Sequence, residues 1–255
     1  MLKAPRLVIL FFASLFIAAC GDSEKQNKAT APNTHTLIFI DKTESVDVNK
    51  PFVAQKYQQA LNSIIEQNIN KAGDQLEIYY IHENTSKARC LSLMSRTDME
   101  DLSGMNATDL EAAKTSYELS IKKERGFILK QAISKLNQQN NTASNLETNI
   151  SASVPVIAKA SEGQAVVKVY YFSDMVESVK AGRDFHIKSP KDNTEAEEWA
   201  KADADKYKNY AFNGPEVTMI LPFEPTTSSK ENNPTVTYYW QKFFENLGVM
   251  SVQEL

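Results

Sequence analysis

The stretch that decides the fold is Thr36-Leu-Ile-Phe-Ile-Asp-Lys-Thr-Glu-Ser45, in which an apolar run ends on an aspartate followed by two hydroxyl residues at alternate positions. Residues 37–40 are continuously apolar, which is typical of a parallel strand covered on both faces. Polar residues at the carboxyl end of such a strand lie where open α/β sheets bind their ligands. The stretch therefore predicts a buried strand whose tip carries an oxygen-rich, cation-binding loop.

A second apolar strand is predicted to end in an acid. Residues 165–174 read Ala-Val-Val-Lys-Val-Tyr-Tyr-Phe-Ser-Asp, so Asp174 follows its strand as Asp41 follows the first one. Right-handed crossovers bring the carboxyl ends of parallel strands to the same edge of a sheet. We therefore expect Asp41 and Asp174 to meet there.

The remaining elements alternate between helix and strand. We expect further strands at 76–81 and 217–223, and a short edge strand at 89–94. One helix is expected from Pro51 to a stop at Gly73 and another from Thr108 or Asp109 to Asn137. Further helices are expected around 150–160, 195–210 and 235–247. The aromatic cluster 238–244 has helical spacing and is predicted to be core rather than a docking surface. The order predicts an α/β fold, doubly wound, with a mostly parallel sheet flanked by helices.

The motif Asp41-x-Thr43-x-Ser45 after an apolar strand resembles the metal-ion-dependent adhesion site of von Willebrand factor A domains. Asp174 stands where that family has a second strand-terminal Asp, and Thr148-Asn149-Ile150 resembles the family's Thr-Asp-Ile helix start. The resemblance implies one divalent ion, Mg²⁺ or else Mn²⁺ or Ca²⁺. It implies hydroxyl ligands from Ser45, Thr43 and Thr148, an anionic shell from Asp41 and Asp174, and a protein partner that offers an acidic side chain.

Two departures from the family pattern and several alternatives remain open. Met175 follows Asp174 where the family often has glycine, and the loop before Thr148 lacks glycine. Ser144 fits the threonine position almost as well as Thr148. An Asp with Thr and Ser nearby can also simply cap the following helix, and a domain of this fold can serve as a metal-free scaffold.

An enzymatic alternative starts from the same aspartate. Residues 40–43, Ile-Asp-Lys-Thr, also resemble the aspartyl-phosphate motif of haloacid dehalogenase-type phosphotransferases, in which Asp41 is the nucleophile. That motif expects glycine at position 44, where this chain has Glu, and a later acidic pair for which Asp174 and Glu177 are a poor match. The chain also has no Gly-x-Ser-x-Gly elbow, no phosphate-binding glycine loop and no His or Cys at metal-ligand spacing. We therefore expect no enzyme.

The first residues are typical of an export signal. Lys3 and Arg6 precede an apolar run at 7–19, which is too short to span a bilayer. The run closes on Ile-Ala-Ala-Cys20, which resembles the lipobox of bacterial lipoproteins; an incidental Cys after an ordinary signal is the alternative. We predict a signal peptide at 1–19, a lipidated Cys20 with a flexible linker to residue 33, and a domain at 34–255 with insertions near 86–108 and 180–215.

The charge balance limits the partners of the exported chain. Without Lys3 and Arg6 it carries 26 basic and 32 acidic residues, a formal net charge of −6, which argues against binding to nucleic acid. It also argues against electrostatic attachment to a membrane, so the lipid would supply the anchor. Cys90 has no intramolecular partner once Cys20 is acylated and is predicted to be a small apolar group. We expect a periplasm-facing envelope lipoprotein, with the choice of membrane left open.

Overall fold

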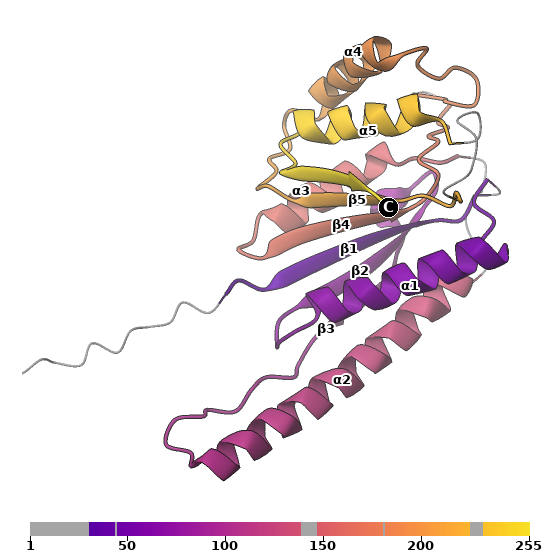
Figure 1. The fold of residues 1–255 in the computed structure, drawn as a ribbon. Helices are drawn as coiled ribbons and strands as arrows, with labels where there is room; N and C mark the ends of the chain where they lie inside the picture. Colours follow the sequence, from indigo (N-terminus) through magenta and orange to yellow (C-terminus); the bar gives the residue numbers. More distant parts are fainter. Residues whose placement is uncertain (1–30, 44, 139–146, 181, 225–231) are drawn as a thin grey trace, which may run out of the picture. The chain divides into compact units, whose positions relative to one another are not determined.

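The computed structural model describes residues 31–43, 45–138, 147–180, 182–224 and 232–255, and within them six strands form one sheet (Figure 1). The strands lie in the order β3-β2-β1-β4-β5-β6, in which β3 is antiparallel to β2 and all other neighbours are parallel. Their bounds are β1 (Thr34–Asp41), β2 (Gln75–Ile81), β3 (Arg89–Met94), β4 (Val166–Phe172), β5 (Glu216–Ile220) and β6 (Ser251–Glu254). The predicted α/β class with a mostly parallel sheet is therefore confirmed.

Helices cover both faces of this sheet (Figure 1). Those of the described residues are α1 (Pro51–Asn68), α2 (Ala107–Asn137), α3 (Val154–Ser161), α4 (Asn193–Ala204) and α5 (Pro234–Asn246), with short 3₁₀ turns at Thr85–Lys87, Ser151–Ser153 and Asp205–Tyr207. One apolar core lies under α1 and α2, and the other lies under α3, α4 and α5. The continuously apolar β1 contributes to both cores, with Ile38 and Ile40 on one face and Leu37 and Phe39 on the other.

The aromatic residues of α5 belong to the second core. Tyr239, Trp240, Phe243 and Phe244 are all buried, and the Phe244 ring stacks on Tyr171 of β4 with centroids 5.5 Å apart. The Trp240 indole Nε1 donates a hydrogen bond of 2.7 Å to the carbonyl of Met175. The prediction that this cluster is core is confirmed, and α5 holds the segment that follows β4.

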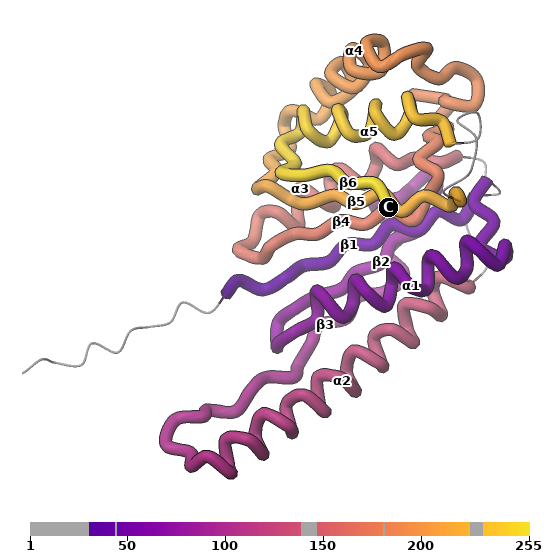
Figure 2. The backbone as a smooth tube through the Cα atoms, viewed as in Figure 1, coloured from indigo at the N-terminus to yellow at the C-terminus, as the bar shows by residue number. Residues whose placement is uncertain are grey.

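The register of β1 and β4 fixes where their polar tips lie. Ile40 pairs with Phe172 in a parallel ladder, so the residues that follow each of them leave the sheet at the same edge. Figure 2 shows the two strands side by side along their length. This pairing sets Asp41 opposite Ser173, one residue before Asp174.

Several element boundaries differ from the sequence expectation. Helix α1 ends at Asn68 rather than at Gly73, because the Asn68 side chain turns inward and donates to the Tyr170 hydroxyl at 3.0 Å. Gly73 instead occupies the turn before β2, with φ of +88°. The predicted helix 195–210 ends at Ala204 and continues only as a 3₁₀ turn, and the strand β6 was not predicted.

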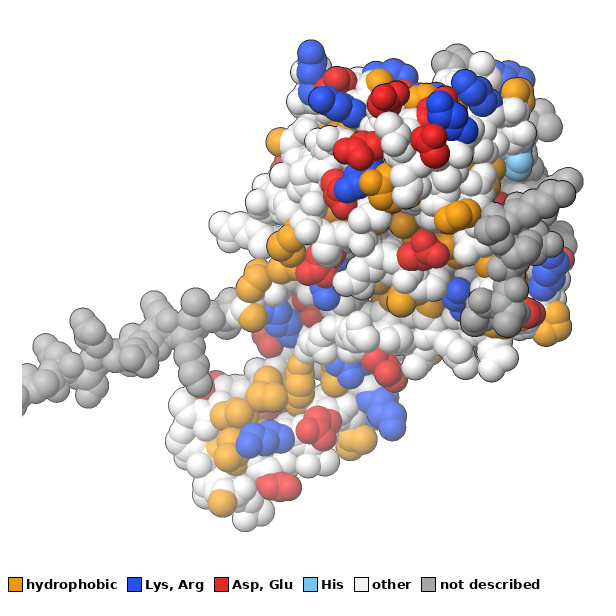
Figure 3. Space-filling model, turned by 45° about the horizontal axis from the view of Figure 1, so that its top comes forward, with side chains coloured by type: hydrophobic (Ala, Val, Ile, Leu, Met, Phe, Trp, Pro, Cys, Tyr) orange, Lys and Arg blue, Asp and Glu red, His pale blue; other side chains and the backbone are white. Residues whose placement is uncertain are grey.

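The surface of the described chain shows mixed charge. On the face drawn in Figure 3, acidic and basic side chains alternate over the coloured part of the molecule, with no extended stripe of either sign. Among the described residues, no helix is both long and apolar enough to cross a bilayer. The predicted signal peptide and Cys20 lie outside the described residues.

Candidate functional site

Asp41 ends β1 and is held by its own loop. Its side chain is completely buried. Its Oδ1 accepts two hydrogen bonds from Thr43, one from the backbone amide at 2.9 Å and one from Oγ1 at 2.6 Å. An aspartate that accepts from the amide two residues later closes a tight turn. The alternate spacing of the motif thus folds the loop back over the carboxylate.

The end of β4 supplies the second half of the site. Ser173 Oγ donates to Asp41 Oδ2 at 2.7 Å and accepts from the Met175 amide at 2.9 Å, which joins the two strand tips through one hydroxyl. Asp174 Oδ1 accepts from the Val176 amide at 3.0 Å. Sequence reasoning missed Ser173, although its position opposite Asp41 follows from the parallel register.

Both carboxylates lie in an unfavourable electrostatic environment. Burial raises the pKa of Asp41 to about 6, and the nearby charge of Asp174 adds to the rise. Burial also raises the pKa of Asp174, against the hydrogen bond from the Val176 amide and the nearby Ser45 hydroxyl. Asp41 and Asp174 thus lie close enough to interact, and burial makes the ionised form of each less favourable than it is in water.

The lysine beside Asp41 does not neutralise it through a direct bond. Lys42 Nζ donates to the Leu136 carbonyl and lies 5.5 Å from the centre of the Tyr80 ring. Burial lowers the pKa of Lys42 to about 8. The nearby His186 lowers the pKa of Asp174 without reversing the effect of burial.

Two hydroxyl groups line the approach to the acids. Thr43 Oγ1 and Ser45 Oγ are 3.1 Å apart, with Thr43 nearly buried and Ser45 exposed. The loop therefore passes from a buried carboxylate and a buried hydroxyl to a hydroxyl at the surface. Ser45 is thus the member of the motif that faces solvent.

Thr148 lies in a short bridge to the chain that follows Asp174. The Thr148 amide donates to the Ser178 carbonyl and the Ser178 amide donates to the Thr148 carbonyl, both at 3.0 Å. The side chain of Thr148 is buried. This pairing ties Thr148 to the Asp174 segment, whereas the alternative residue Ser144 lies outside the described residues.

Met175 has a backbone conformation that glycine adopts more readily. Its φ is +62°, and among the described non-glycine residues it alone has a positive φ. Its side chain is fully buried and its carbonyl accepts from Trp240. A left-handed conformation costs a non-glycine residue roughly 1–2 kcal/mol, so packing around Met175 holds a turn that glycine would adopt freely.

Tyr57 of α1 is a buried hydroxyl beside the two acids. Its ring packs edge-on against Phe172 at 4.9 Å, and burial together with the charges of Asp41 and Asp174 raises its pKa. Its Oη is inaccessible to solvent and has no hydrogen-bond partner among the described residues. Sequence reasoning did not single out Tyr57, because its spacing is that of an ordinary core residue of a helix.

The donor set fits a hard cation. It consists only of carboxylate and hydroxyl oxygens, the ligands that Mg²⁺ and Ca²⁺ prefer. Tyr57 Oη is a buried polar atom that still needs a partner, which a metal-bound water would provide. No cluster of three or more His, Cys, Asp or Glu side chains in the described ranges is arranged to hold a metal, so the hydroxyls are essential to this interpretation.

Comparison with protein-family models finds no match, and neither does comparison with curated protein sequences. Among solved structures, proximal thread matrix protein 1 from the mussel byssus, with a zinc-occupied MIDAS motif, is 12% identical with a TM-score of 0.35, covering 88% of this chain and 42% of that one. A von Willebrand factor type A structure from Catenulispora acidiphila is 11% identical with a TM-score of 0.38, covering 89% and 39%. A mutant PilB minor pilin from Streptococcus sanguinis is 8% identical with a TM-score of 0.40, covering 89% and 58%.

The chain thus spans less than two thirds of the length of each of these structures. At such identities and TM-scores the similarities add nothing to the assignment of individual residues. The site is assigned from the geometry of this chain alone.

Proposed function

We propose that this chain is a von Willebrand factor A-like binding or scaffolding module that holds one divalent cation at Asp41, Thr43, Ser45, Thr148 and Asp174. The observation that carries the proposal is the burial of two interacting carboxylates at one sheet edge, each with a raised pKa. A cation between them would remove both the desolvation penalty and the repulsion. Mg²⁺ is the first candidate, with Mn²⁺ and Ca²⁺ as alternatives.

The mixture of ligands suggests how such an ion would serve binding. Hydroxyl groups satisfy coordination positions without adding negative charge, and two carboxylates with three hydroxyls supply one oxygen each, one fewer than the roughly six that Mg²⁺ prefers. The exposed Ser45 marks the solvent side, where an open position would be. An acidic side chain of a partner protein is the group best suited to fill it.

The proposed location follows from the N-terminal sequence. Lys3 and Arg6, the short apolar run and the Ile-Ala-Ala-Cys20 ending support export and lipidation. Two acyl signals hold a protein firmly to a membrane without a spanning helix. We propose an envelope lipoprotein that faces the periplasm and binds protein rather than nucleic acid.

A phosphotransferase reaction at Asp41 is the enzymatic alternative. That chemistry needs an exposed nucleophile and further acids around the metal, but Asp41 is fully buried under Thr43. Glu177, the other acid of the second motif, binds Ser151 through both the backbone amide at 2.9 Å and Oγ at 3.0 Å. These contacts favour a binding module, and incubation with acetyl phosphate should leave no adduct on Asp41.

Calorimetry with Mg²⁺ and Mn²⁺ tests the metal site. We expect saturable binding with a stoichiometry of one, and its loss in Asp41→Ala. Asp47→Ala is the matched control, because Asp47 is an exposed acid of the same loop whose carboxylate accepts from the Asn49 amide. Absence of binding heat in the wild-type chain would instead support the metal-free scaffold, and equal losses in both variants would indicate a diffuse charge effect.

Membrane fractionation tests the anchor separately. Cys20→Ser should abolish acylation and release the chain from the membrane fraction. A membrane fraction unchanged by Cys20→Ser would contradict the lipoprotein proposal while leaving the metal site untouched. Crosslinking in the native host, with and without a chelator, would then capture the metal-dependent partner.

A further inference from the structure

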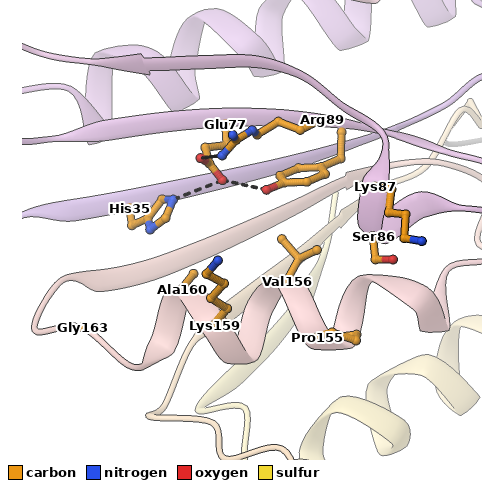
Figure 4. Close-up of a pocket in the computed structure, with 11 residues that line it drawn as sticks. His35, Glu77, Ser86, Lys87, Arg89, Pro155, Val156, Lys159, Ala160 and Gly163 are labelled. Atoms are coloured by element: carbon orange, nitrogen blue, oxygen red, sulfur yellow. Dashed lines mark hydrogen bonds and ion pairs between the residues drawn. The ribbon is translucent and has the colours of Figure 1, made fainter.

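A cavity lies away from the two acids, between one face of the sheet and α3. Its volume is about 600 Å³, within the range of roughly 300–1,000 Å³ typical of small-molecule sites. The lining comes from β1, β2, the 3₁₀ turn Thr85–Lys87, β3 and α3, and includes none of the five proposed metal ligands. Figure 4 shows its sheet side above and α3 below.

The sheet side of the cavity is a hydrogen-bonded network around one buried acid. Glu77 Oε1 accepts from Arg89 Nη1 at 2.7 Å, and Oε2 accepts from the Tyr79 hydroxyl at 2.8 Å. His35 Nε2 lies 3.7 Å from the same Oε2 (Figure 4). The side chain of Glu77 is only 7% exposed. This acid is therefore fully engaged in positioning its neighbours.

Arg89 keeps binding capacity beyond its bond to Glu77. Its side chain is 53% exposed, and only Nη1 bonds the carboxylate. A guanidinium carries five N–H donors in a fixed fork, so several still point toward solvent or the cavity. Glu77 thus orients the Arg89 guanidinium, which remains available to an anionic ligand.

The opposite wall supplies further positive charge and an apolar surface. Lys87 and Lys159 line the cavity, and neither forms an ion pair with any described residue. In Figure 4 the Lys159 side chain rises from α3 toward the sheet, beside the apolar side chains of Val156 and Ala160. Lys87, Arg89 and Lys159 thus line a cavity that has Glu77 as the one acid among its lining residues, in a chain whose formal net charge is −4.

We propose that this cavity binds a small organic anion, a carboxylate or phosphate group on a compact apolar body. The anionic oxygens bind Lys159, Lys87 and the free N–H groups of Arg89, because charge-assisted bonds of this type are the strongest available at such a wall. The apolar body packs on Val156 and Pro155. This site is independent of the cation at Asp41 and Asp174.

Calorimetry on the full chain in detergent, with a chelator present, tests this proposal. Phenyl phosphate and benzoate are the probes. Inorganic phosphate, which lacks the apolar body, and benzyl alcohol, which lacks the anionic group, are the comparisons. We expect at least one aromatic anion to bind more tightly than both comparisons, and binding to weaken as salt is added. Absence of saturable binding by both probes up to about 10 mM would overturn the proposal.

Substitutions at the cavity wall give a second test. Lys87 and Lys159 are exposed, so their replacement does not threaten the core. Lys159→Gln should weaken the aromatic anion about fivefold and Lys159→Glu by more, as expected for one partly exposed charge contact. Lys130→Gln, at an exposed lysine of α2, is the matched control and should leave the affinity unchanged. Equal weakening in Lys130→Gln and Lys159→Gln would show nonspecific attraction and refute the site.

Discussion

Replacement of Asp41 by asparagine should stabilise the metal-free domain above pH 6, although it removes a central residue of the proposed site. Burial and the neighbouring Asp174 raise the pKa of Asp41 from 3.8 to about 6. A shift of that size corresponds to about 3 kcal/mol of unfavourable free energy in the ionised state. Asparagine retains one carbonyl oxygen for the two bonds from Thr43 but loses the acceptor for Ser173, which costs about 1 kcal/mol. The expected net gain at pH 8 is therefore about 1–2 kcal/mol.

The gain should depend on pH with a definite sign. Because the folded chain holds the Asp41 proton more tightly than the unfolded chain, this group makes the wild type more stable as the pH falls from above 6 toward 4. Asparagine does not titrate, so its advantage should disappear over the same interval. At pH 4 we expect Asp41→Asn to be about 0.5 kcal/mol less stable than the wild type, because the lost hydrogen bond then outweighs what remains of the ionisation penalty.

Urea unfolding in the presence of a chelator, at pH 8 and pH 4, measures both differences. Asp74→Asn is the matched control, since Asp74 is also buried but accepts backbone amide bonds from Thr34, Asn70 and Lys71. That control should lower the free energy of unfolding at pH 8 by about 1–3 kcal/mol. If Asp41→Asn also lowers it at pH 8, the two acids of the site are not in the strained electrostatic state described above.

Three further predictions address the surroundings of the site. Met175→Gly should destabilise the fold by roughly 1–3 kcal/mol, because it removes a buried side chain. Met175→Ala should destabilise it by about 1 kcal/mol more, because only glycine relieves the strain of the positive φ. Thermal unfolding of the two variants measures this difference. With a chelator present, Tyr57→Phe should leave the free energy of unfolding unchanged or raise it by up to about 1 kcal/mol, since it removes a buried hydroxyl without a partner among the described residues. A clearly lower free energy of unfolding would contradict this and would show that the hydroxyl forms a hydrogen bond. Mg²⁺ affinity measured by calorimetry should fall as the pH drops below 6, by about tenfold per unit for one displaced proton, and a flat profile would argue against ligation through Asp41.

The sheet was predictable because its strands carry strong local signals. Residues 37–40 are continuously apolar, residues 166–172 are apolar except for Lys168, and the two segments lie on adjacent central strands. The strand β6 carries no such signal, since Ser251 and Val252 are half-buried and the next two residues are exposed. It forms because the edge of β5 offers unpaired backbone groups, which depends on tertiary structure rather than on the sequence of β6.

Only those site residues that directly follow an apolar strand and carry an acidic side chain could be predicted from the sequence. Asp41 and Asp174 could be placed together because parallel strands share an edge. Ser173 and Tyr57 could not be singled out, since one is a common strand-terminal residue and the other has the spacing of an ordinary core position. Their roles depend on side-chain directions, namely the bond from Ser173 to Asp41 and the buried hydroxyl of Tyr57, which a residue pattern does not contain.

The size of the electrostatic penalty at Asp41 links the proposed cation to the stability of the fold. Keeping this acid ionised at neutral pH opposes folding by about 3 kcal/mol. A ligand that binds only the folded chain stabilises it by about 2.7 kcal/mol at a concentration one hundred times its dissociation constant. Ordinary saturation with a divalent ion would thus offset most of the penalty. The domain should therefore be markedly more stable with the cation than with a chelator, and Asp41→Asn should abolish that difference, because it removes both the penalty and the ligand.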